Sequence, residues 1–372
     1  MDDVIVVGGR CAGAPTAMLL AQAGLKVRVI ERSPQLGETL SGHNITSAGT
    51  ARLRAWGLLD AILATGCPPL TGMNLSIDGE PVPATPPADP ACPGVAPRRG
   101  VLDPMLVEAA RQAGAQVDMG NSVRALLYYG TRVTGVRTDR GDVSARLVIG
   151  ADGRNSRIAR LVGATKYLTC PSATYAYYTY WRDTGLKQVC VFFERDCFVG
   201  MLPTNDDLTL VFFQAPHAGF SRARRDPMSH YQSLLRSHPA VMKTLSGASP
   251  AEPLSGTGDL PTFFRTPAGP GWALAGDARH HKDPLPAHGI ADAFSDAEVI
   301  ASAVRTGWDS NLDDAIAASL AQRDVQARAL SSATDAAAAA IGSVRPAALA
   351  QAMGALDELE QALEPGAPLQ PA

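Results

Sequence analysis

Apolar and polar runs alternate at the start of the chain in the order of a strand, a turn, a helix and a second strand. Residues 4–7 form a continuous β-branched run, which is typical of a strand buried on both faces of a parallel sheet. A glycine-containing turn follows, and residues 14–23 have the composition of a helix that ends at Gly24. Residues 26–30 have the pattern of the next strand. Together these runs predict a βαβ unit.

The middle of the chain combines two further predicted helices with a set of short strands. Residues 48–59 and 103–113 have helical patterns, and Asp103 is expected to cap the second helix. Residues 81–97 are rich in proline, so we expect a surface connection there. Residues 115–148 contain short apolar runs typical of strands. Turns between these strands are expected at three glycines, namely Gly130, Gly135 and Gly141.

The second half of the chain changes its pattern twice. Residues 169–264 contain short alternating runs rich in aromatic side chains, which predict an antiparallel sheet. Residues 272–275 have the pattern of a buried strand, and a helix is predicted over residues 290–304. The remainder has the pattern of alanine-rich helix, broken at Gly342 and Pro346.

Three separate apolar runs have the character of strands in a single sheet. Residues 4–7, 147–150 and 272–275 each lead directly into a turn that contains glycine. We expect them to lie in one parallel sheet although they are far apart in the sequence. The predicted fold is therefore an α/β fold whose units are discontinuous in sequence.

Composition and charge exclude several classes of protein. Of the 372 residues, 46% are hydrophobic and 19% are charged, which is typical of a packed globule and not of a disordered chain. The formal net charge is −3 and no long basic run occurs, so the sequence does not favour nucleic-acid binding. The longest apolar stretch, residues 336–344, is far shorter than the ~20 residues of a membrane span, so no stable membrane insertion is expected.

The six cysteines are scattered along the chain. They form no Cys-x-x-Cys pair and no metal-ligand spacing surrounds them, so we expect no metal site. Unpaired thiols in a chain of this size indicate a reducing compartment. The first residues also lack the basic region of a signal peptide. The expected localisation is cytoplasmic.

The first glycine-containing turn carries a candidate binding motif. Gly8 and Gly13 occupy the first and third glycine positions of the pattern G-x-G-x-x-G, whereas Arg10 occupies the second. The guanidinium of Arg10 is expected to pair with a phosphate in place of close backbone approach. Glu31 ends the second strand, where an acid can accept hydrogen bonds from ribose hydroxyls. The turn predicts a dinucleotide site; the alternative is an ordinary βαβ turn without a ligand.

Two later segments add further glycine motifs, each after a predicted strand of the same sheet. Residues 150–153 read Gly-Ala-Asp-Gly, and residues 276–278 read Gly-Asp-Ala and continue through His280, Pro284 and Gly289. In this order the motifs resemble those of the class A flavoprotein monooxygenases, the para-hydroxybenzoate hydroxylase-like FAD enzymes. The stretches around residues 39–59 and 96–103 are similar to the bacterial small-molecule-tailoring branch of that family.

The resemblance covers most of residues 1–305 and implies FAD as the cofactor. It implies a discontinuous Rossmann-like FAD-binding domain, an antiparallel-sheet substrate domain and C-terminal helices. The expected boundaries are 1–70, 98–165 and 266–330 for the FAD-binding domain, 71–97 and 166–265 for the substrate domain, and 331–372 for the C-terminal helical segment and tail.

The family's motifs also imply which residues of this chain bind FAD. Glu31 and Arg32 would lie at the adenosine, Arg99 on the ribityl and pyrophosphate side, and Asp277 at the ribityl chain. The chain departs from the family at Ala287, where glycine is usual, and at Ala291, where asparagine is usual. The implied cofactor-binding residues are Gly8, Gly9, Arg10, Cys11, Ala12, Gly13, Glu31, Arg32, Arg99, Val123, Asp152, Gly276, Asp277, Pro284, Gly289 and Ile290.

The implied reaction is oxygen transfer to an aromatic or polyunsaturated small molecule in secondary metabolism. NAD(P)H would bind transiently as the reductant, and O2 would react to form a flavin C4a-hydroperoxide. One alternative is an FAD-dependent reductase or desaturase of alkenes, like the geranylgeranyl reductases, and another is a non-redox protein that keeps FAD as a scaffold. Flavin halogenases share the fold, but no lysine lies between Lys26 and Lys166 and the tryptophans are isolated, so halogenation is not expected.

The aromatic run at residues 175–181 marks the candidate substrate pocket. Aromatic residues on neighbouring strands of this sheet could form an apolar wall over the flavin, although ordinary sheet packing is the alternative for each of them. The expected wall residues are Tyr178, Tyr180, Phe193 and Phe213. No catalytic acid or base is assigned; the histidines whose segments are expected near the flavin are His43 and His281, together with His280 and His288. The expected partner is a small-molecule substrate, and the chain is expected to be a monomer or homodimer.

Overall fold

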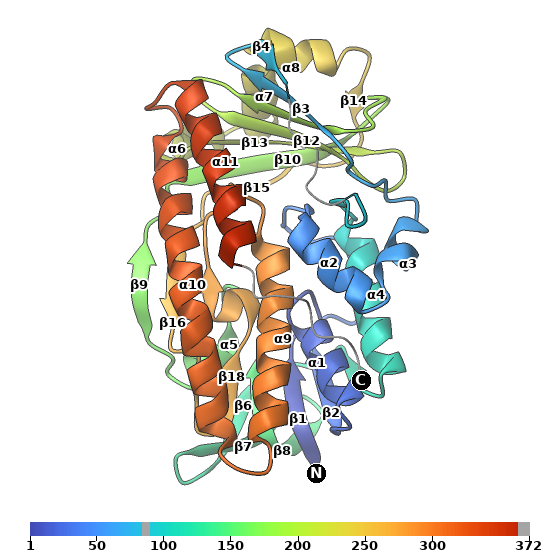
Figure 1. Cartoon of the computed structure of the whole chain (residues 1–372), viewed down its shortest axis with the longest axis vertical. Coiled ribbons are helices and arrows are strands. Elements are labelled where there is room, and N and C mark those ends of the chain that lie inside the picture. The colour runs from blue at the N-terminus through green and yellow to red at the C-terminus, as the bar shows by residue number, and fades with distance from the viewer. Residues whose placement is uncertain (84–89, 364–372) are drawn as a thin grey trace.

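The computed structural model describes residues 1–83 and 90–363 as three β-sheets with helices packed around them (Figure 1). In Figure 1 the first sheet lies in the lower half of the molecule and the second sheet crosses its upper part, while helices α9 (Gly289–Gly307) and α10 (Leu312–Ala340) run lengthwise beside them. Within the described residues no helix is both long and apolar enough to cross a membrane.

The first sheet has a parallel centre in the order β18-β8-β1-β2-β5. Strand β1 pairs in parallel with β2 and with β8, and β8 pairs in parallel with β18, so the three apolar runs predicted to share a sheet do so. The hairpin β6–β7 continues from β8 in antiparallel fashion. The strands are β1 (Asp2–Val7), β2 (Val27–Glu31), β5 (Gln116–Met119), β6 (Val123–Tyr129), β7 (Arg132–Thr138), β8 (Gly141–Gly150), β17 (Ala268–Gly269) and β18 (Trp272–Leu274).

Alternate residues of β1 face two different cores. Val4 and Val6 pack with the helices α1 (Gly13–Gln22), α4 (Arg99–Gln112) and α9 on one face of the sheet. Ile5 and Val7 pack with residues of the β6–β7 hairpin on the other face. All four valine and isoleucine side chains are buried, which explains why the strand is apolar without alternation.

The second sheet has the order β14-β10-β13-β12-β11-β3-β4, with β15 beside β10. It is antiparallel as predicted, except that β11 and β3 pair in parallel. Its strands are β3 (Met73–Ile77), β4 (Glu80–Val82), β10 (Thr174–Arg182), β11 (Val189–Phe193), β12 (Phe198–Pro203), β13 (Thr209–Pro216), β14 (Ser249–Pro250) and β15 (Ser255–Thr257). One face packs against α6 (Phe220–Ala223), α7 (Pro227–Arg236) and α8 (Pro239–Thr244).

A small third sheet and the last helices complete the described fold. The sheet has the order β19-β16-β9, with bounds β19 (His280–His281), β16 (Thr262–Arg265) and β9 (Lys166–Cys170). The helices α10 and α11 (Pro346–Leu363) pack on each other after a break at Gly342, as predicted. The remaining elements are α2 (Ser47–Ala55), α3 (Leu59–Leu63), α5 (Arg157–Leu161), η1 (His217–Gly219) and η2 (Gly276–Ala278).

Several local predictions were wrong, each for an identifiable reason. The helix predicted over residues 48–59 divides into α2 and α3, because Gly57 between them has a φ of +73°. The helix predicted from Asp103 begins at Arg99, so Asp103 lies inside α4 and is not its cap. Gly135 lies within β7 and not in a turn; a Cβ there would be 2.3 Å from the carbonyl oxygen of Val143.

The proline-rich connection predicted over residues 81–97 is only partly a surface segment. It includes the end of β4, and residues 84–89 lie outside the described part of the chain. Val95 and Ala96 are fully buried, because Val95 forms a backbone bridge with Ile45 and Ala96 packs beneath the second sheet.

Candidate functional site

The glycine turn between β1 and α1 has the close approaches that only glycine allows. Gly8 has a φ of +103°, and a Cβ there would be 2.4 Å from the carbonyl oxygen of Ala151. A Cβ on Gly13 would be 1.8 Å from the carbonyl oxygen of Gly8. Within the described chain no side chain caps α1 and its first turn carries no acid. The Ala14 amide donates to the Arg10 carbonyl at 2.9 Å and the Thr16 amide to the Ala12 carbonyl at 3.3 Å, so the amides that an anion such as a pyrophosphate can use are those of residues 10–13, where the turn enters α1.

Glu31 is held at the carboxyl end of β2, next to this turn. Its Oε2 accepts a hydrogen bond from the Gly9 amide at 2.8 Å, and its Oε1 accepts one from the Ser33 amide at 2.8 Å. The Asn121 amide donates to the Glu31 carbonyl at 2.9 Å, so the segment that enters β6 at Val123 lies beside it. The structure thus places Glu31 and the start of β6 at Val123 side by side, as predicted for the adenosine end. Arg32, the residue after Glu31, is exposed.

Arg10 and Arg99 both bind one buried carboxylate, that of Asp103. Arg99 donates to Asp103 from Nε at 3.0 Å and from Nη2 at 2.9 Å, and Arg10 Nη1 donates to the same carboxylate and to the Gly37 carbonyl. The Asp103 side chain is completely buried. The structure engages Nη1 of Arg10 with protein oxygens, and the pairing of this guanidinium with a phosphate stays a prediction. Asp103, misread from the sequence as a helix cap, is therefore a central support of the turn.

Cys11 is a buried neighbour of this cluster. Its Sγ donates to Asp103 Oδ1 at 3.5 Å. Burial, opposed by the nearby Arg99, raises the pKa of Cys11 to about 12, so the side chain stays a neutral thiol at physiological pH.

Asp152, which the Asp-Gly motif placed at the cofactor, supports a helix in the structure. Its Oδ2 accepts hydrogen bonds from the Arg157 amide at 2.6 Å and the Ile158 amide at 3.1 Å, and its Oδ1 accepts one from the Ser156 hydroxyl. The carboxylate therefore satisfies the amino end of α5. This local role is the one that the structure shows.

Asp277 is presented to solvent from an otherwise buried segment. Every other residue from 271 to 280 is buried, whereas Asp277, in η2 at the end of β18, is exposed. It lies close enough to Arg99 for its charge to contribute to raising the pKa of that guanidinium. An exposed carboxylate at the carboxyl end of a parallel strand is suited to accept hydrogen bonds from a polyol chain.

A buried ion cluster, not predicted from the sequence, holds the backbone beside Asp277. Asp296 on α9 accepts a hydrogen bond from the Gly276 amide at 2.9 Å and binds Arg279 through Nε at 3.1 Å and Nη2 at 2.6 Å. Arg279 also pairs with Asp324 on α10. All three charged side chains are at most 2% exposed. The cluster ties η2 to two long helices.

The loop that leads into α9 has the backbone conformation of a glycine-rich loop. Ala287, which stands where the family has glycine, has a φ of +57°. Gly289 is exposed as the first residue of α9, and within the described residues no side-chain hydrogen bond caps this helix. Asp292 in the first turn is paired with Lys282 and Arg323, so the amino end of α9 can stabilise negative charge on a group placed against Pro284 to Ile290.

The left-handed backbone of Ala287 leads to a stability prediction. We expect Ala287→Gly to raise the free energy of unfolding by about 1 kcal/mol, because a side chain in this conformation is strained. The matched control is Ala318→Gly on an exposed position of α10, where the same change should lower it by about 1 kcal/mol. Urea unfolding of the two variants measures the difference. Destabilisation of both variants by equal amounts would contradict the conformational reason.

The loop from Glu38 to His43 meets the aromatic face of the second sheet. The His43 ring stacks on Tyr180 with centroids 5.7 Å apart and lies edge-on to Tyr178 at 6.0 Å. His43 Nε2 is hydrogen-bonded to the Tyr180 hydroxyl, which also donates to Glu38 Oε2 at 3.2 Å. The Tyr178 hydroxyl donates to the Thr39 carbonyl at 3.1 Å. Three predicted site residues, His43, Tyr178 and Tyr180, are thus in one cluster.

His43 is neutral in this environment. Burial, together with the nearby positive charge of Arg99, lowers its pKa to about 4. Its side chain is completely buried, with the rings of Tyr178 and Tyr180 packed against it. Burial also holds the pKa of Tyr180 well above its usual value, which keeps this hydroxyl protonated and able to donate.

The other two predicted wall residues lie elsewhere. Phe213 is on the opposite face of the sheet, where it packs against Tyr175 and against Tyr231 of α7. Phe212, the cross-strand partner of Tyr178, lies on the face where Phe213 was expected. Phe193 shares the face of Tyr178 but packs in the cluster formed with α10 and α11. Successive side chains of a strand point to opposite faces of the sheet, so Phe212 and Phe213 cannot both face the site. The prediction did not use this alternation.

The remaining candidate histidines are not brought to His43. His280 stacks on Phe264 with centroids 4.1 Å apart and bonds to Ser331 on α10. His281 stacks on Phe263 in the third sheet, and its Nδ1 bonds to the Pro261 carbonyl. His288 is buried directly before α9. Of the four, His43 contacts the predicted substrate wall, through Tyr178 and Tyr180.

Comparison with known proteins gives three findings. A family model described as "FAD binding domain" matches residues 1–315. The chain is 28% identical over 307 residues to digeranylgeranylglycerophospholipid reductase 2 of Methanopyrus kandleri, covering 77% of this chain and 73% of that protein. It is 31% identical over 169 residues to 6-methylpretetramide 4-monooxygenase of Streptomyces rimosus, covering 43% of this chain and 40% of that protein.

The fold is similar to that of a solved flavoprotein. PqsL, a probable FAD-dependent monooxygenase from Pseudomonas aeruginosa, matches with a TM-score of 0.80 over 96% of this chain and 99% of its own, at 19% identity. This likeness confirms the predicted fold class. Because the family model covers most of the sequence, the chain belongs to the FAD binding domain family, as an FAD-dependent oxidoreductase with the fold of the class A flavoprotein monooxygenases.

Proposed function

We propose that the protein is a monooxygenase that uses NAD(P)H and O2 to hydroxylate or epoxidise an aromatic or polyunsaturated small molecule of secondary metabolism. The observation that carries the proposal is the contact between the loop from Glu38 to His43 and the aromatic face of the second sheet. That contact gives the site a wall of tyrosines with ordered hydroxyls. A planar substrate with a polar substituent fits such a wall.

The described residues fit FAD at three places. The uncapped amino end of α1 suits the pyrophosphate, Glu31 suits the adenosine ribose, and the exposed Asp277 suits the ribityl chain. Bound FAD supplies the redox chemistry, namely acceptance of a hydride from NAD(P)H and activation of O2. The open amino end of α9 stabilises negative charge beside it.

The protein's own contribution is orientation, exclusion of water and control of a proton. Tyr178 and Phe212 present ring surface from the second sheet. Tyr180 holds a proton at its hydroxyl, between the neutral His43 and the partly exposed Glu38. Arg98 lies over the Tyr180 ring, with its Cζ 4.5 Å from the centroid, and pairs with Glu38, so this network is held from both sides. It offers a route by which a proton passes between the buried site and solvent.

Alkene reduction is the second candidate function. It is supported by the similarity to digeranylgeranylglycerophospholipid reductase 2, which spans more of the chain than the similarity to the monooxygenase of Streptomyces rimosus. In that case the same FAD site would pass a hydride to a carbon–carbon double bond and no oxygen would enter the product.

One experiment separates these functions. The purified holoprotein is reduced with NADH or NADPH, exposed to isotopically labelled O2, and assayed by mass spectrometry with phenols, indoles, polyketides and a prenylated lipid. The proposal expects one labelled oxygen atom in an aromatic or polyunsaturated product. A prenyl chain that gains two hydrogens and no label would establish the reductase instead. A flavin that neither reductant bleaches, with any of these compounds present, would indicate a non-redox role.

A further inference from the structure

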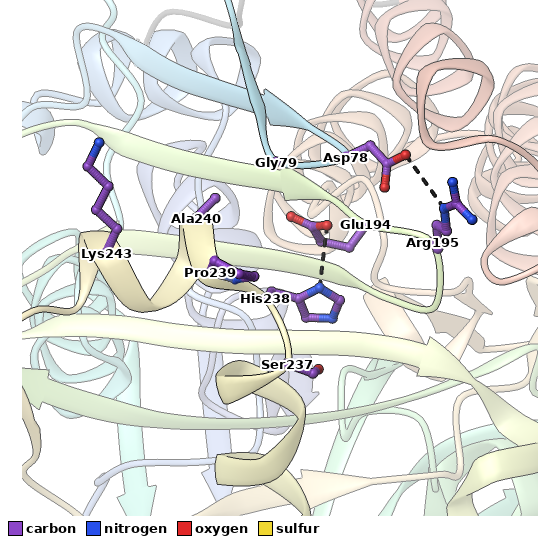
Figure 2. Close-up of a pocket in the computed structure, with 9 residues that line it drawn as sticks. All are labelled: Asp78, Gly79, Glu194, Arg195, Ser237, His238, Pro239, Ala240 and Lys243. Atoms are coloured by element: carbon purple, nitrogen blue, oxygen red, sulfur yellow. Dashed lines mark ion pairs between the residues drawn. The ribbon is translucent and has the colours of Figure 1, made fainter.

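A second cluster of reactive side chains lies where strands β11 and β12 of the second sheet are joined. It joins the turn between β11 and β12, which carries Glu194, Asp196 and Cys197, to His238 at the junction of α7 and α8. Figure 2 shows the His238 ring pointing toward Glu194 beneath the β3–β4 turn. The family resemblance, the comparisons and the proposed reaction assign nothing to these residues.

The donor atoms of three of these side chains converge. His238 Nε2 is 3.1 Å from Asp196 Oδ1 and 3.4 Å from Cys197 Sγ, and the three atoms lie within 4.8 Å of one another. A tetrahedral ion with bonds of about 2.1 Å to nitrogen and oxygen and about 2.3 Å to sulfur holds its ligand atoms about 3.3 to 3.6 Å apart. The two separations from His238 Nε2 need to widen by only a few tenths of an ångström.

Glu194 has the place of a residue that orients a metal-binding histidine. Its Oε2 is 3.4 Å from His238 Nδ1, on the opposite side of the ring from Asp196 and Cys197. A carboxylate that accepts from Nδ1–H fixes the tautomer in which Nε2 is free to bind a metal. Glu194 is 93% buried, and within the described residues its Oε1 has no hydrogen-bond partner.

The site is also preformed and has room for a fourth ligand. The Glu194 amide donates to the Cys197 carbonyl at 3.0 Å, which closes the turn that carries the two sequence-adjacent ligands. A depression of about 550 Å³ lies on the Glu194 side of the His238 ring, where Glu194, His238 and Asp78 line it (Figure 2). Asp196, on the other side of the ring, is 66% exposed, so a water molecule can approach the three donor atoms from there and complete four-coordination.

We propose that Asp196, Cys197 and His238 bind one divalent transition-metal ion of the zinc class. A thiolate, an imidazole and a carboxylate together suit zinc better than magnesium or calcium, which prefer oxygen ligands alone. The cysteine spacing suggested no metal site, because two ligands are adjacent and the third is on another element. The alternative is a hydrogen-bonded cluster in which a protonated His238 bridges the carboxylates.

The test uses the FAD-loaded protein after dialysis against a chelator. Titration with cobalt(II) is followed by the sulfur-to-cobalt charge-transfer band and by ligand-field bands at wavelengths longer than those at which oxidised flavin absorbs. We expect one equivalent per chain, displaced by zinc. Cys197→Ser is expected to remove the charge-transfer band, and His238→Ala to weaken binding at least about tenfold. Glu194→Gln should weaken it about 10- to 100-fold through loss of the supporting hydrogen bond.

Matched variants keep the outcome interpretable. Asp196→Asn alters a side chain that is 66% exposed, so it tests a ligand without disturbing the core. Cys170→Ser on β9 is the thiol control, and it should bind cobalt like the unaltered protein. Bound flavin should be unchanged in every variant. Absence of a charge-transfer band in the unaltered protein, or equal binding by the Asp196→Asn and Cys170→Ser proteins, would overturn the proposal in favour of the hydrogen-bonded cluster.

Discussion

Asp277→Asn is expected to weaken FAD binding about 10- to 100-fold, which corresponds to the about 1.5–3 kcal/mol of a hydrogen bond to a charged group. The side chain is exposed in the midst of a buried segment, so the change removes a ligand contact without removing a structural one. The dissociation constant is measured by quenching of flavin fluorescence as FAD is added to the apoprotein.

The control for this variant is another exposed carboxylate of the same chain. Asp309→Asn, in the turn between α9 and α10, makes the same change of charge at the opposite end of α9. It should leave FAD affinity unchanged. Equal affinities for the Asp277 and Asp309 variants would show that Asp277 does not contact the cofactor.

Arg279→Met is expected to lower the free energy of unfolding by about 3–5 kcal/mol, because it removes the guanidinium that pairs with two buried carboxylates. Asp296 and Asp324 are both at most 2% exposed and both pair with this guanidinium. Asp296 also holds the Gly276 amide, so the variant should lose FAD affinity as well as stability. Urea unfolding and FAD titration measure the two effects on one preparation.

A surface pair of the same chemistry is the control for Arg279. Arg137 pairs with Asp142 at 2.8 Å, but the two side chains are 58% and 47% exposed. Arg137→Met should therefore leave the free energy of unfolding nearly unchanged, because water screens this pair. If both variants lost a similar amount of free energy of unfolding, burial would not be the reason why the Arg279 cluster stabilises the protein.

The parts of the site that are local in sequence could be predicted from it. The turn with Gly8 and Gly13, the acid at the end of β2 and the acid after β18 each follow a buried strand within a few residues. In each case the backbone geometry is dictated by neighbours along the chain. The structure places Glu31 and Asp277 at the carboxyl ends of parallel strands of one sheet, as expected.

The supporting residues could not be predicted, because their partners are distant in sequence. Asp103 on α4 pairs with Arg10, which lies 93 residues earlier in the chain. Asp296 on α9 accepts a hydrogen bond from the Gly276 amide, 20 residues earlier. No local pattern distinguishes such an acid from a helix cap or a solvent-exposed residue. The spacing of Arg99 and Asp103 at i and i+4 indicates that these two residues pair on one helix, but it does not indicate the contact of Asp103 with Arg10.

Phe213 lies on the face of the second sheet opposite to Tyr178, where it was not expected. Tyr178 and Phe212 are cross-strand partners, and Phe213 points to the other face because it is the next residue along β13. The aromatic run alone does not reveal which of two consecutive phenylalanines faces the site. The side on which α7 packs decides it, and that is a tertiary feature.

The central claim is that one extended FAD molecule is bound at Glu31 and Asp277 together. The direct test is FAD titration of the apoprotein carrying both Glu31→Gln and Asp277→Asn, compared with each single variant. Because the two acids would contact separate parts of one ligand, the account predicts that the losses of binding free energy add and that the double variant purifies without bound flavin. A double variant that retains flavin with the affinity of the unaltered protein would contradict it.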